Sequence, residues 1–203
     1  MSEIAPSLQD LYASWGNTDL SPQESLTYEV GFESNLNAFL FSATYFNRDV
    51  DNIIAYDNTS FKMVNKGDAK ISGVEVEIGI DVTDDIDANL NYTYTKNDNP
   101  TIRIPKNKVN VNLSYAYTNK TNFSLSFQYT DERDDTFFKP DFSTEVITLD
   151  AYSLLDFSVN HKVFDDRMTL FASITNMLNE DYQEIYGFNT RGRNYNLGFR
   201  LSL

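Results

Sequence analysis

The chain has 203 residues, 30 of them acidic and 16 basic, and a formal net charge of −14; this balance excludes a nucleic-acid-binding role, because phosphate contacts need a basic surface. It has no cysteine, which excludes a disulfide framework and a cysteine-based metal site. No run approaches the roughly 18 apolar residues of a transmembrane helix, whereas membrane-spanning strands, whose signature is alternation, are not excluded.

Apolar and polar residues alternate with a period of two along most of the chain, a pattern typical of strands with two different faces. We predict nine strands and no helix. Their apolar stripes lie, in chain order, within residues 26–32, 39–45, 74–80, 88–94, 109–117, 123–129, 155–159, 170–174 and 195–203. The last stripe continues to the final residue, and the opposite stripe there is fully polar.

The connections between the predicted strands alternate between short and long. We expect short turns at Ser34–Asn35, Thr83–Asp85, Thr118–Lys120 and Asp165–Arg167, and long segments at 1–24, 48–67, 97–106, 131–151 and 177–191. This describes an antiparallel up-and-down meander with two different ends, as in outer-membrane barrels, where short turns face the periplasm and long loops face outside. The apolar stripe also persists in nearly every strand, which favours a membrane barrel over a soluble sandwich.

Five segments carry a likeness to a known family. They are "APSLQDLYASWGNTDLSPQES" (5–25), "YFNRDVDNIIAYDN" (45–58), "NKGDAKISGVEVEI" (65–78), "ITNMLNEDYQE" (174–184) and "GRNYNLGFRLSL" (192–203). In this order, and over essentially the whole chain, they resemble the C-terminal part of a TonB-dependent outer-membrane receptor. The resemblance implies an all-β, antiparallel up-and-down transmembrane barrel of about 22 strands, with about nine of them here and the plug domain absent.

The resemblance also implies a domain organisation. Nine strands do not close an even-numbered bacterial barrel, and we recognise no plug, energy-coupling segment or signal peptide. We therefore expect residues 1–24 to be an extracellular loop segment and residues 25–203 to be the last strands of a longer receptor. Two alternatives stay open. One is a small complete outer-membrane barrel, a pore or adhesin, with a tenth strand in residues 1–12; the other is a soluble β-sandwich that binds carbohydrate.

The function implied by the resemblance is uptake of a scarce nutrient across the outer membrane of a Gram-negative bacterium. A ferric siderophore is favoured over cobalamin or an oligosaccharide, and the absence of histidine between Ala5 and Leu20 disfavours haem. Implied partners are outer-membrane lipid, the missing N-terminal barrel and plug, the TonB protein acting through that plug, the barrel-assembly machinery and a small-molecule nutrient. The sequence has no catalytic triad, phosphate loop or metal-ligand cluster, so we predict no enzymatic activity, no metal site and no cofactor.

Aromatic residues of the long segments are the candidate ligand contacts, because aromatic side chains pack well against flat organic ligands. They are Tyr12, Trp15, Tyr56, Phe61, Phe137, Phe138 and Tyr186. The alternative is that they pack the loops together or lie at the lipid headgroups. The charge run at 131–135 is expected to be solvated, and His161, the only histidine, is expected at the membrane interface near a periplasmic turn.

The polar stripes supply two further groups of candidate residues. The residues expected to face the lumen are Glu29, Glu33, Glu75, Glu77 and Arg200. The glutamates either contact the plug through hydrogen bonds to arginine or simply hydrate the interior, and Arg200 is a candidate partner for them. The resemblance implies that the final strand carries a signal for the assembly machinery. Its residues would be Asn196, Gly198, Leu201 and Leu203, the last at a position where the family usually has an aromatic residue.

Overall fold

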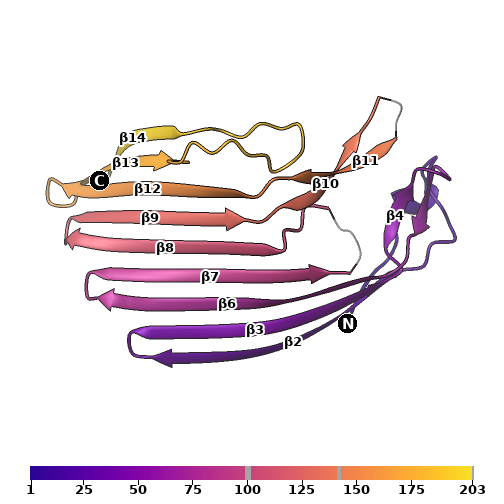
Figure 1. Ribbon diagram of the computed structural model, residues 1–203, viewed down its shortest axis with the longest axis horizontal. Helices are drawn as coiled ribbons and strands as arrows, with labels where there is room; N and C mark the ends of the chain where they lie inside the picture. The colour runs from indigo at the N-terminus through magenta and orange to yellow at the C-terminus, as the bar shows by residue number, and fades with distance from the viewer. Residues whose placement is uncertain (99–101, 141–142, 203) are drawn as a thin grey trace.

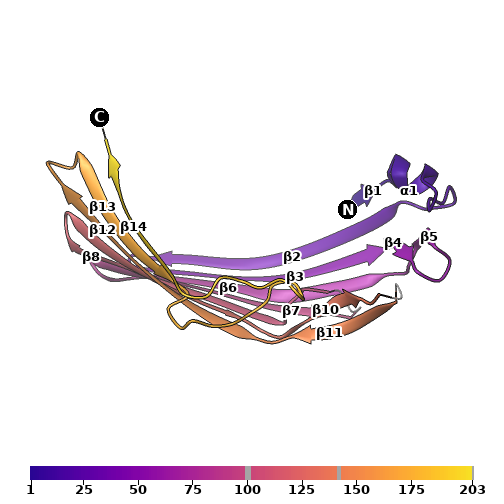
Figure 2. The same cartoon turned by 90° about the horizontal axis from the view of Figure 1, so that it is seen from above.

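The computed structural model describes residues 1–98, 102–140 and 143–202. One curved antiparallel sheet dominates it (Figures 1 and 2), with the strand order β1-β2-β3-β6-β7-β8-β9-β12-β13-β14. Nine of these strands are the predicted ones, namely β2 (Gln23–Leu36), β3 (Phe39–Asp51), β6 (Ala69–Thr83), β7 (Ile86–Asn97), β8 (Asn107–Thr118), β9 (Thr121–Thr130), β12 (Tyr152–Val163), β13 (Met168–Thr175) and β14 (Asn194–Leu201). The tenth, β1 (Ser2–Ile4), is only three residues long.

The long connections contain more regular structure than the sequence predicts. They form the hairpins β4 (Ile54–Asp57) with β5 (Lys62–Asn65) and β10 (Arg133–Phe138) with β11 (Thr144–Leu149), and the helix α1 (Leu8–Tyr12). The prediction of no helix is therefore wrong at α1. Ser7 and Asp10 begin this helix with a reciprocal capping box, in which each side chain accepts a hydrogen bond from the other's backbone N–H. No helix in the described part of the chain is long and apolar enough to cross a membrane.

The turn between β2 and β3 lies later than predicted. The two strands pair as far as Leu36 and Phe39, so Ser34 and Asn35 belong to β2 and the turn is made by Asn37 and Ala38. Asn37 has a φ of 52°, a left-handed conformation that asparagine tolerates better than most residues. Short turns gather at one end of the sheet, and the hairpins lie at the other (Figure 1).

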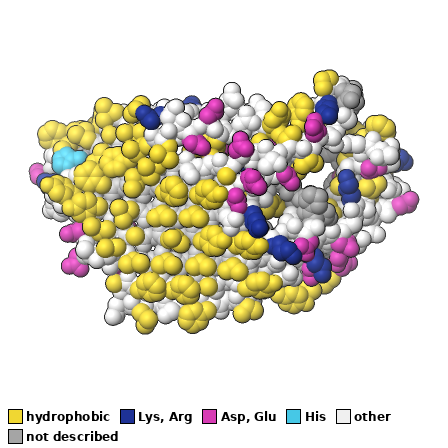
Figure 3. All heavy atoms as spheres, in the orientation of Figure 1, with side chains coloured by type: hydrophobic (Ala, Val, Ile, Leu, Met, Phe, Trp, Pro, Cys, Tyr) yellow, Lys and Arg dark blue, Asp and Glu magenta, His cyan; other side chains and the backbone are white. Residues whose placement is uncertain are grey.

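The convex face of the sheet is apolar and uncovered. Neighbouring strands place their apolar side chains in rows, for example Val30 beside Tyr45 and Tyr45 beside Val74, and Figure 3 shows such rows across this face. Val30 is 73% exposed and Leu197 87% exposed. The only other sheets among the described residues are the two hairpins. Since the soluble sandwich requires a second layer over this face, that alternative is wrong.

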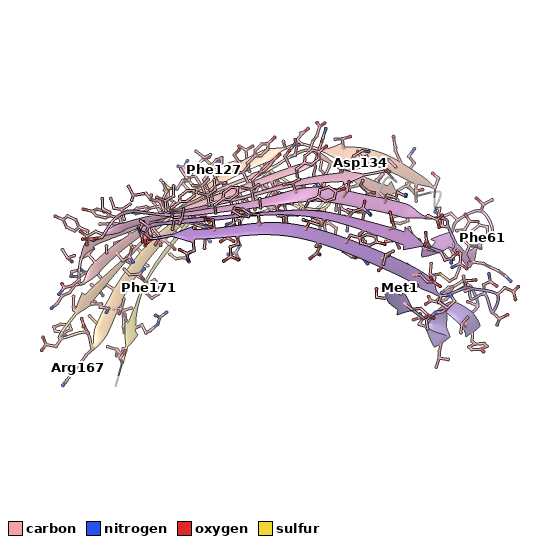
Figure 4. The ribbon with its side chains drawn as sticks, turned by 90° about the horizontal axis from the view of Figure 1, so that it is seen from below. Met1, Phe61, Phe127, Asp134, Arg167 and Phe171 are labelled. Carbon is pink, nitrogen blue, oxygen red and sulfur yellow. The ribbon has the colours of Figure 1, made fainter. Side chains whose placement is uncertain are left out.

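The concave face is polar, but two phenylalanine rings lie on it over glycines of the next strand. Phe46 of β3 is paired with Gly73 of β6, and Phe171 of β13 with Gly198 of β14. A Cβ atom would lie 2.5 Å from the ring Cζ atom at either glycine, so only glycine leaves room for the ring. Figure 4 shows the sheet edge-on, with Phe171 labelled among the concave strands and Phe127 toward the convex side.

The sheet has two open edges. β1 pairs with β2 only from Gln23 to Ser25, and β14 has β13 as its only neighbour in the sheet described here. The small complete barrel requires a membrane-crossing strand within residues 1–12 and closure onto β14. Because β1 has three residues and the sheet is not closed, the structure does not support this alternative.

Candidate functional site

Four of the predicted ligand contacts lie together beyond one end of β2 and β3. Tyr12 and Trp15 belong to or follow α1, while Tyr56 and Phe61 belong to the β4–β5 hairpin, where Figure 4 labels Phe61. The backbone N–H of Met63 donates to the Trp15 carbonyl at 2.8 Å and so joins the hairpin to the segment after α1. All four aromatic side chains are exposed, so this cluster presents them to the surroundings instead of burying them in a loop core.

The other three predicted contacts lie near the β10–β11 hairpin. The Phe137 and Tyr186 rings meet edge to face with their centroids 5.1 Å apart, and Phe138 is exposed on the other side of β10. Tyr186 also lines a cavity of about 320 Å³ together with Tyr182 and Gln183. The two aromatic groups come from different parts of the strand order, so the structure does not gather all seven residues into one site.

Asp135 of β10 is the centre of a buried polar contact between three loop segments. Its side chain has no solvent exposure and accepts hydrogen bonds from the backbone N–H of Tyr186 at 2.8 Å, the N–H of Thr136 at 2.7 Å and Arg103 Nε at 2.8 Å. Burial raises the pKa of this carboxyl, but these hydrogen bonds and the Arg103 charge outweigh it, so its pKa lies below the usual 3.8. The expectation that residues 131–135 are solvated is wrong here.

Arg133 makes a second contact with the same loop. Its Nη2 atom donates to the Gln183 carbonyl at 2.8 Å and to Glu184 Oε2 at 3.1 Å. The guanidinium lies 5.3 Å from the Tyr152 ring centroid, and the Tyr152 hydroxyl donates to the other Glu184 oxygen. We call the contacts of Arg103, Arg133 and Asp135 described here the loop latch. The sequence predicts no such contact, although residues 133 and 135 are two positions apart, as residues on one face of a strand are.

Replacing Asp135 with Ala should release residues 183–187 from the hairpin. The substitution removes an ion pair and two backbone hydrogen bonds from a buried carboxylate, and each hydrogen bond to a charged group contributes about 1.5–3 kcal/mol. We therefore expect amide hydrogen exchange at Tyr186 to rise by about ten- to a hundredfold. Asp134→Ala is the matched control, because among the described residues this neighbouring carboxylate accepts only a long 3.3 Å bond from Thr148.

The latch also has an expected pH dependence. Since the pKa of Asp135 is lower in the folded state, its contribution is fully present above the usual value and is lost as the pH falls through the folded-state pKa. Two results would contradict this role of Asp135. One is equally fast exchange at Tyr186 in the Asp135→Ala and Asp134→Ala variants, and the other is faster exchange at Tyr186 in the wild type when the pH is lowered only to near neutral.

The concave face carries the predicted glutamates on β2 and β6, on either side of β3. The strand register places Glu75 in line with Gly31 and Glu77 in line with Glu33. One residue of β3 lies between the two members of each pair. Glu29 and Glu75 line a cavity of about 370 Å³ that also contains Phe46 and Arg48 among its walls. Arg200 lies on β14 at the far edge of the sheet, and no ion pair joins it to these glutamates among the described residues. The expectation that Arg200 pairs with them is therefore wrong.

The remaining predicted residues lie on β12 and β14. His161 lies beside the short turns, where its Nδ1 atom is 2.8 Å from Thr121 Oγ1, and Figure 3 shows the histidine among apolar side chains. Asn196, Gly198 and Leu201 belong to β14, whereas Leu203 lies outside the described residues. Their role as an assembly signal stays a prediction.

Comparison with known proteins identifies the family of this sheet. The sequence profile described as "TonB dependent receptor-like, beta-barrel" matches residues 2–177. The chain belongs to this TonB-dependent receptor family. It is accordingly part of an outer-membrane barrel of a Gram-negative bacterium, and TonB-dependent receptors are transporters rather than enzymes.

Solved structures of TonB-dependent receptors share the fold. The ferric-catecholate import receptor Fiu of Escherichia coli K12 is 17% identical with a TM-score of 0.78, over 98% of this chain and 31% of that one. The ferripyoverdine receptor of the outer membrane of Pseudomonas aeruginosa is 19% identical with a TM-score of 0.76, over 91% and 28%. The FrpB iron transporter of Neisseria meningitidis is 18% identical with a TM-score of 0.73, over 89% and 31%. The chain thus matches less than a third of the length of these structures.

Proposed function

We propose that the chain forms the C-terminal wall of a receptor that imports a ferric siderophore, with residues 1–24 as an extracellular loop segment and residues 25–203 as barrel strands. The observation that carries this proposal is a curved sheet with an uncovered apolar convex face and a polar concave face, in a chain of the TonB-dependent receptor family. The similar structures described as ferric-catecholate, ferripyoverdine and iron transporters support iron as the nutrient. Cobalamin and oligosaccharide are the alternative cargoes.

The concave glutamates support a plug inside this wall. Glu29, Glu33, Glu75 and Glu77 make no ion pair among the described residues, and a plug with basic side chains would neutralise them. In this proposal TonB acts through the plug, and the barrel-assembly machinery recognises the end of the chain through Asn196, Gly198, Leu201 and Leu203. The exposed aromatic residues of the two loop clusters contact the nutrient as it arrives from outside.

The proposal is tested by nutrient uptake. A bacterium that lacks its own siderophore receptors should grow under iron limitation when it produces the complete receptor containing this chain, and this growth should disappear in a strain without TonB. Ferric siderophores, cobalamin and a maltose-type oligosaccharide are offered separately, each to a strain whose growth depends on importing that nutrient. Rescue by cobalamin or the oligosaccharide alone would contradict the siderophore assignment, and TonB-independent rescue would contradict energised import.

A further inference from the structure

The charged side chains of the concave face are segregated by strand. The concave positions of β2, β3, β6 and β7 carry one cation and six carboxylates among the described residues, namely Arg48, Glu29, Glu33, Glu75, Glu77, Asp81 and Asp87. On β8, Lys108 lies in the same row as Glu75. The concave positions of β9, β12, β13 and β14, all of them described, carry one carboxylate, Asp156, and two cations, Lys162 and Arg200. The face therefore changes from acidic to basic across the sheet.

The cations of the last strands lie together at the short-turn end of the sheet. Lys162 of β12 and Arg200 of β14 both pair with Thr169 of β13, so they are two strand spacings apart, or about 10 Å. Lys120, in the turn between β8 and β9, adjoins Lys162, whose backbone N–H donates to the Lys120 carbonyl at 2.8 Å. We call Lys120, Lys162 and Arg200 the basic rim.

The basic rim is not neutralised within the described structure. Its three residues are exposed, and none of them makes an ion pair with another described residue. Their neighbours on the concave face, Asn160, Phe171 and Gly198, are uncharged. The β12–β13 turn adds two carboxylates and Arg167, which Figure 4 labels, so this end of the sheet has four cations and two carboxylates.

The carboxylates on the acidic side of the sheet are too far away to neutralise the rim. By the strand register, Asp85 and Asp87 at the same end of the sheet lie about 16 and 20 Å from Lys162. These distances exceed the screening length of about 8 Å at physiological ionic strength. On β12 itself, Asp156 lies about 20 Å along the strand from Lys162 and accepts a hydrogen bond from the Asn176 N–H at 2.8 Å. An anionic group from elsewhere can therefore bind at the rim.

The alternation of the strands directs these cations into the lumen. Leu170 and Phe199 pair with each other next to Thr169 and Arg200, and they lie exposed on the apolar convex face. Because successive residues of a strand face opposite sides of the sheet, the cations face away from lipid. The group that neutralises them must therefore lie inside the barrel.

We infer that the basic rim holds an acidic flank of the plug and thereby determines how the plug is turned inside the barrel. This inference rests on the proposed function, which places a plug inside this wall with basic side chains toward the four glutamates. Charge complementarity of this kind fixes an orientation, because a plug turned the other way would bring like charges together on both sides. The change in charge from β2–β7 to β9–β14 thus gives the plug one favoured orientation.

Amide hydrogen exchange of the complete receptor, followed by mass spectrometry, tests the inference. In the double variant Lys162→Glu/Arg200→Glu we expect exchange to become about tenfold faster in one plug segment, because attraction to the wall is replaced by repulsion. This segment should have a net negative charge. In the double variant Glu75→Lys/Glu77→Lys, a different plug segment with a net positive charge should respond.

The matched control is the double variant Lys62→Glu/Lys66→Glu. It changes the net charge by the same amount as the rim variant, at two exposed residues of the β4–β5 hairpin region and outside the concave face. Plug exchange should not change in this control. Folding of each variant is checked by its heat-modifiable migration. If the rim variant with two glutamates does not fold, Lys162→Gln/Arg200→Gln takes its place, because it removes the two charges without adding opposite ones.

The outcomes separate this inference from the proposed function. Plug exchange that is unchanged in the folded rim variant would overturn the inference. A response confined to a neutral or basic segment, or one segment that responds to both wall variants, would also overturn it. TonB-dependent uptake by the wild type would leave the proposed function intact in each of these cases. If the wild type imports no nutrient in a TonB-dependent way while the acidic segment responds as expected, the proposed function fails and the orientation of the plug stands.

Discussion

Leu113→Arg should remove most of the folded protein from the outer membrane. Leu113 lies near the middle of β8 on the convex face, beside Ala88 and Leu125 of the neighbouring strands. An arginine on the lipid face of a barrel costs about 2–4 kcal/mol at the middle of the bilayer. This is a large part of the 5–15 kcal/mol or so by which folded proteins are stable.

Asn110→Arg is the control for this prediction, since it adds the same charge three residues earlier in the same strand. Asn110 lies on the concave face between Asn91 and Gln128, where the neighbouring side chains are polar. The measurement is the amount of heat-modifiable receptor in purified outer membranes, together with its unfolding free energy in lipid vesicles. Equal losses for the two arginine variants would mean that the apolar face does not contact lipid.

Gly73→Ala should destabilise the sheet by about 3 kcal/mol, which is large for the addition of one methyl group. The new Cβ atom would lie 2.1 Å from the Tyr94 carbonyl oxygen and 2.5 Å from Phe46 Cζ. Since a backbone oxygen cannot rotate away, β6 and β7 must separate locally. Gly79→Ala, on the same strand and face, should be nearly neutral, because its Cβ would meet Leu40 at 3.4 Å.

A second pair of variants separates the backbone clash from the ring contact. At Gly198 the nearest atoms to an added Cβ all belong to the Phe171 ring, so Phe171→Leu should restore the stability that Gly198→Ala removes. Phe46→Leu should not restore Gly73→Ala, because the Tyr94 carbonyl still obstructs it. Unfolding free energies in lipid vesicles measure both. A Gly73→Ala variant as stable as Gly79→Ala would contradict the close approach of β6 and β7.

The nine strands were predictable because apolar and polar residues alternate along each of them. Every strand has one apolar and one polar environment, so the periodic pattern is repeated even in the edge strand β14. The helix α1 and the β4–β5 hairpin were not predictable in this way. They are short, and contacts between distant segments hold them in place, such as the hydrogen bond from Met63 to Trp15. The β2–β3 turn was misplaced because the polar residues Ser34 and Asn35 interrupt the apolar stripe before β2 ends at Leu36.

The candidate site was less predictable than the fold. The alternation of polar and apolar residues predicts that the four glutamates lie on one face of the sheet. It does not predict the partners of a charged side chain, because these depend on which loops meet. Arg133 and Glu184 are 51 residues apart in the sequence. Nothing in the sequence distinguishes Asp135 from the other charged residues of the run 131–135. Arg200 is a different case. In a meander, sequence order is also spatial order, so its distance from the glutamates of β2 and β6 was already implied by the predicted topology.

The open edges of the sheet determine where further barrel strands can join this chain. The outer side of β14, and of β2 beyond Ser25, has unpaired N–H and C=O groups among the described residues. In hydrocarbon such groups are costly, and another strand is their natural partner. The chain covers 31% of the Fiu receptor that it matches, so in a closed barrel of that size further strands meet both edges and leave no backbone group of β2 or β14 unpaired in lipid.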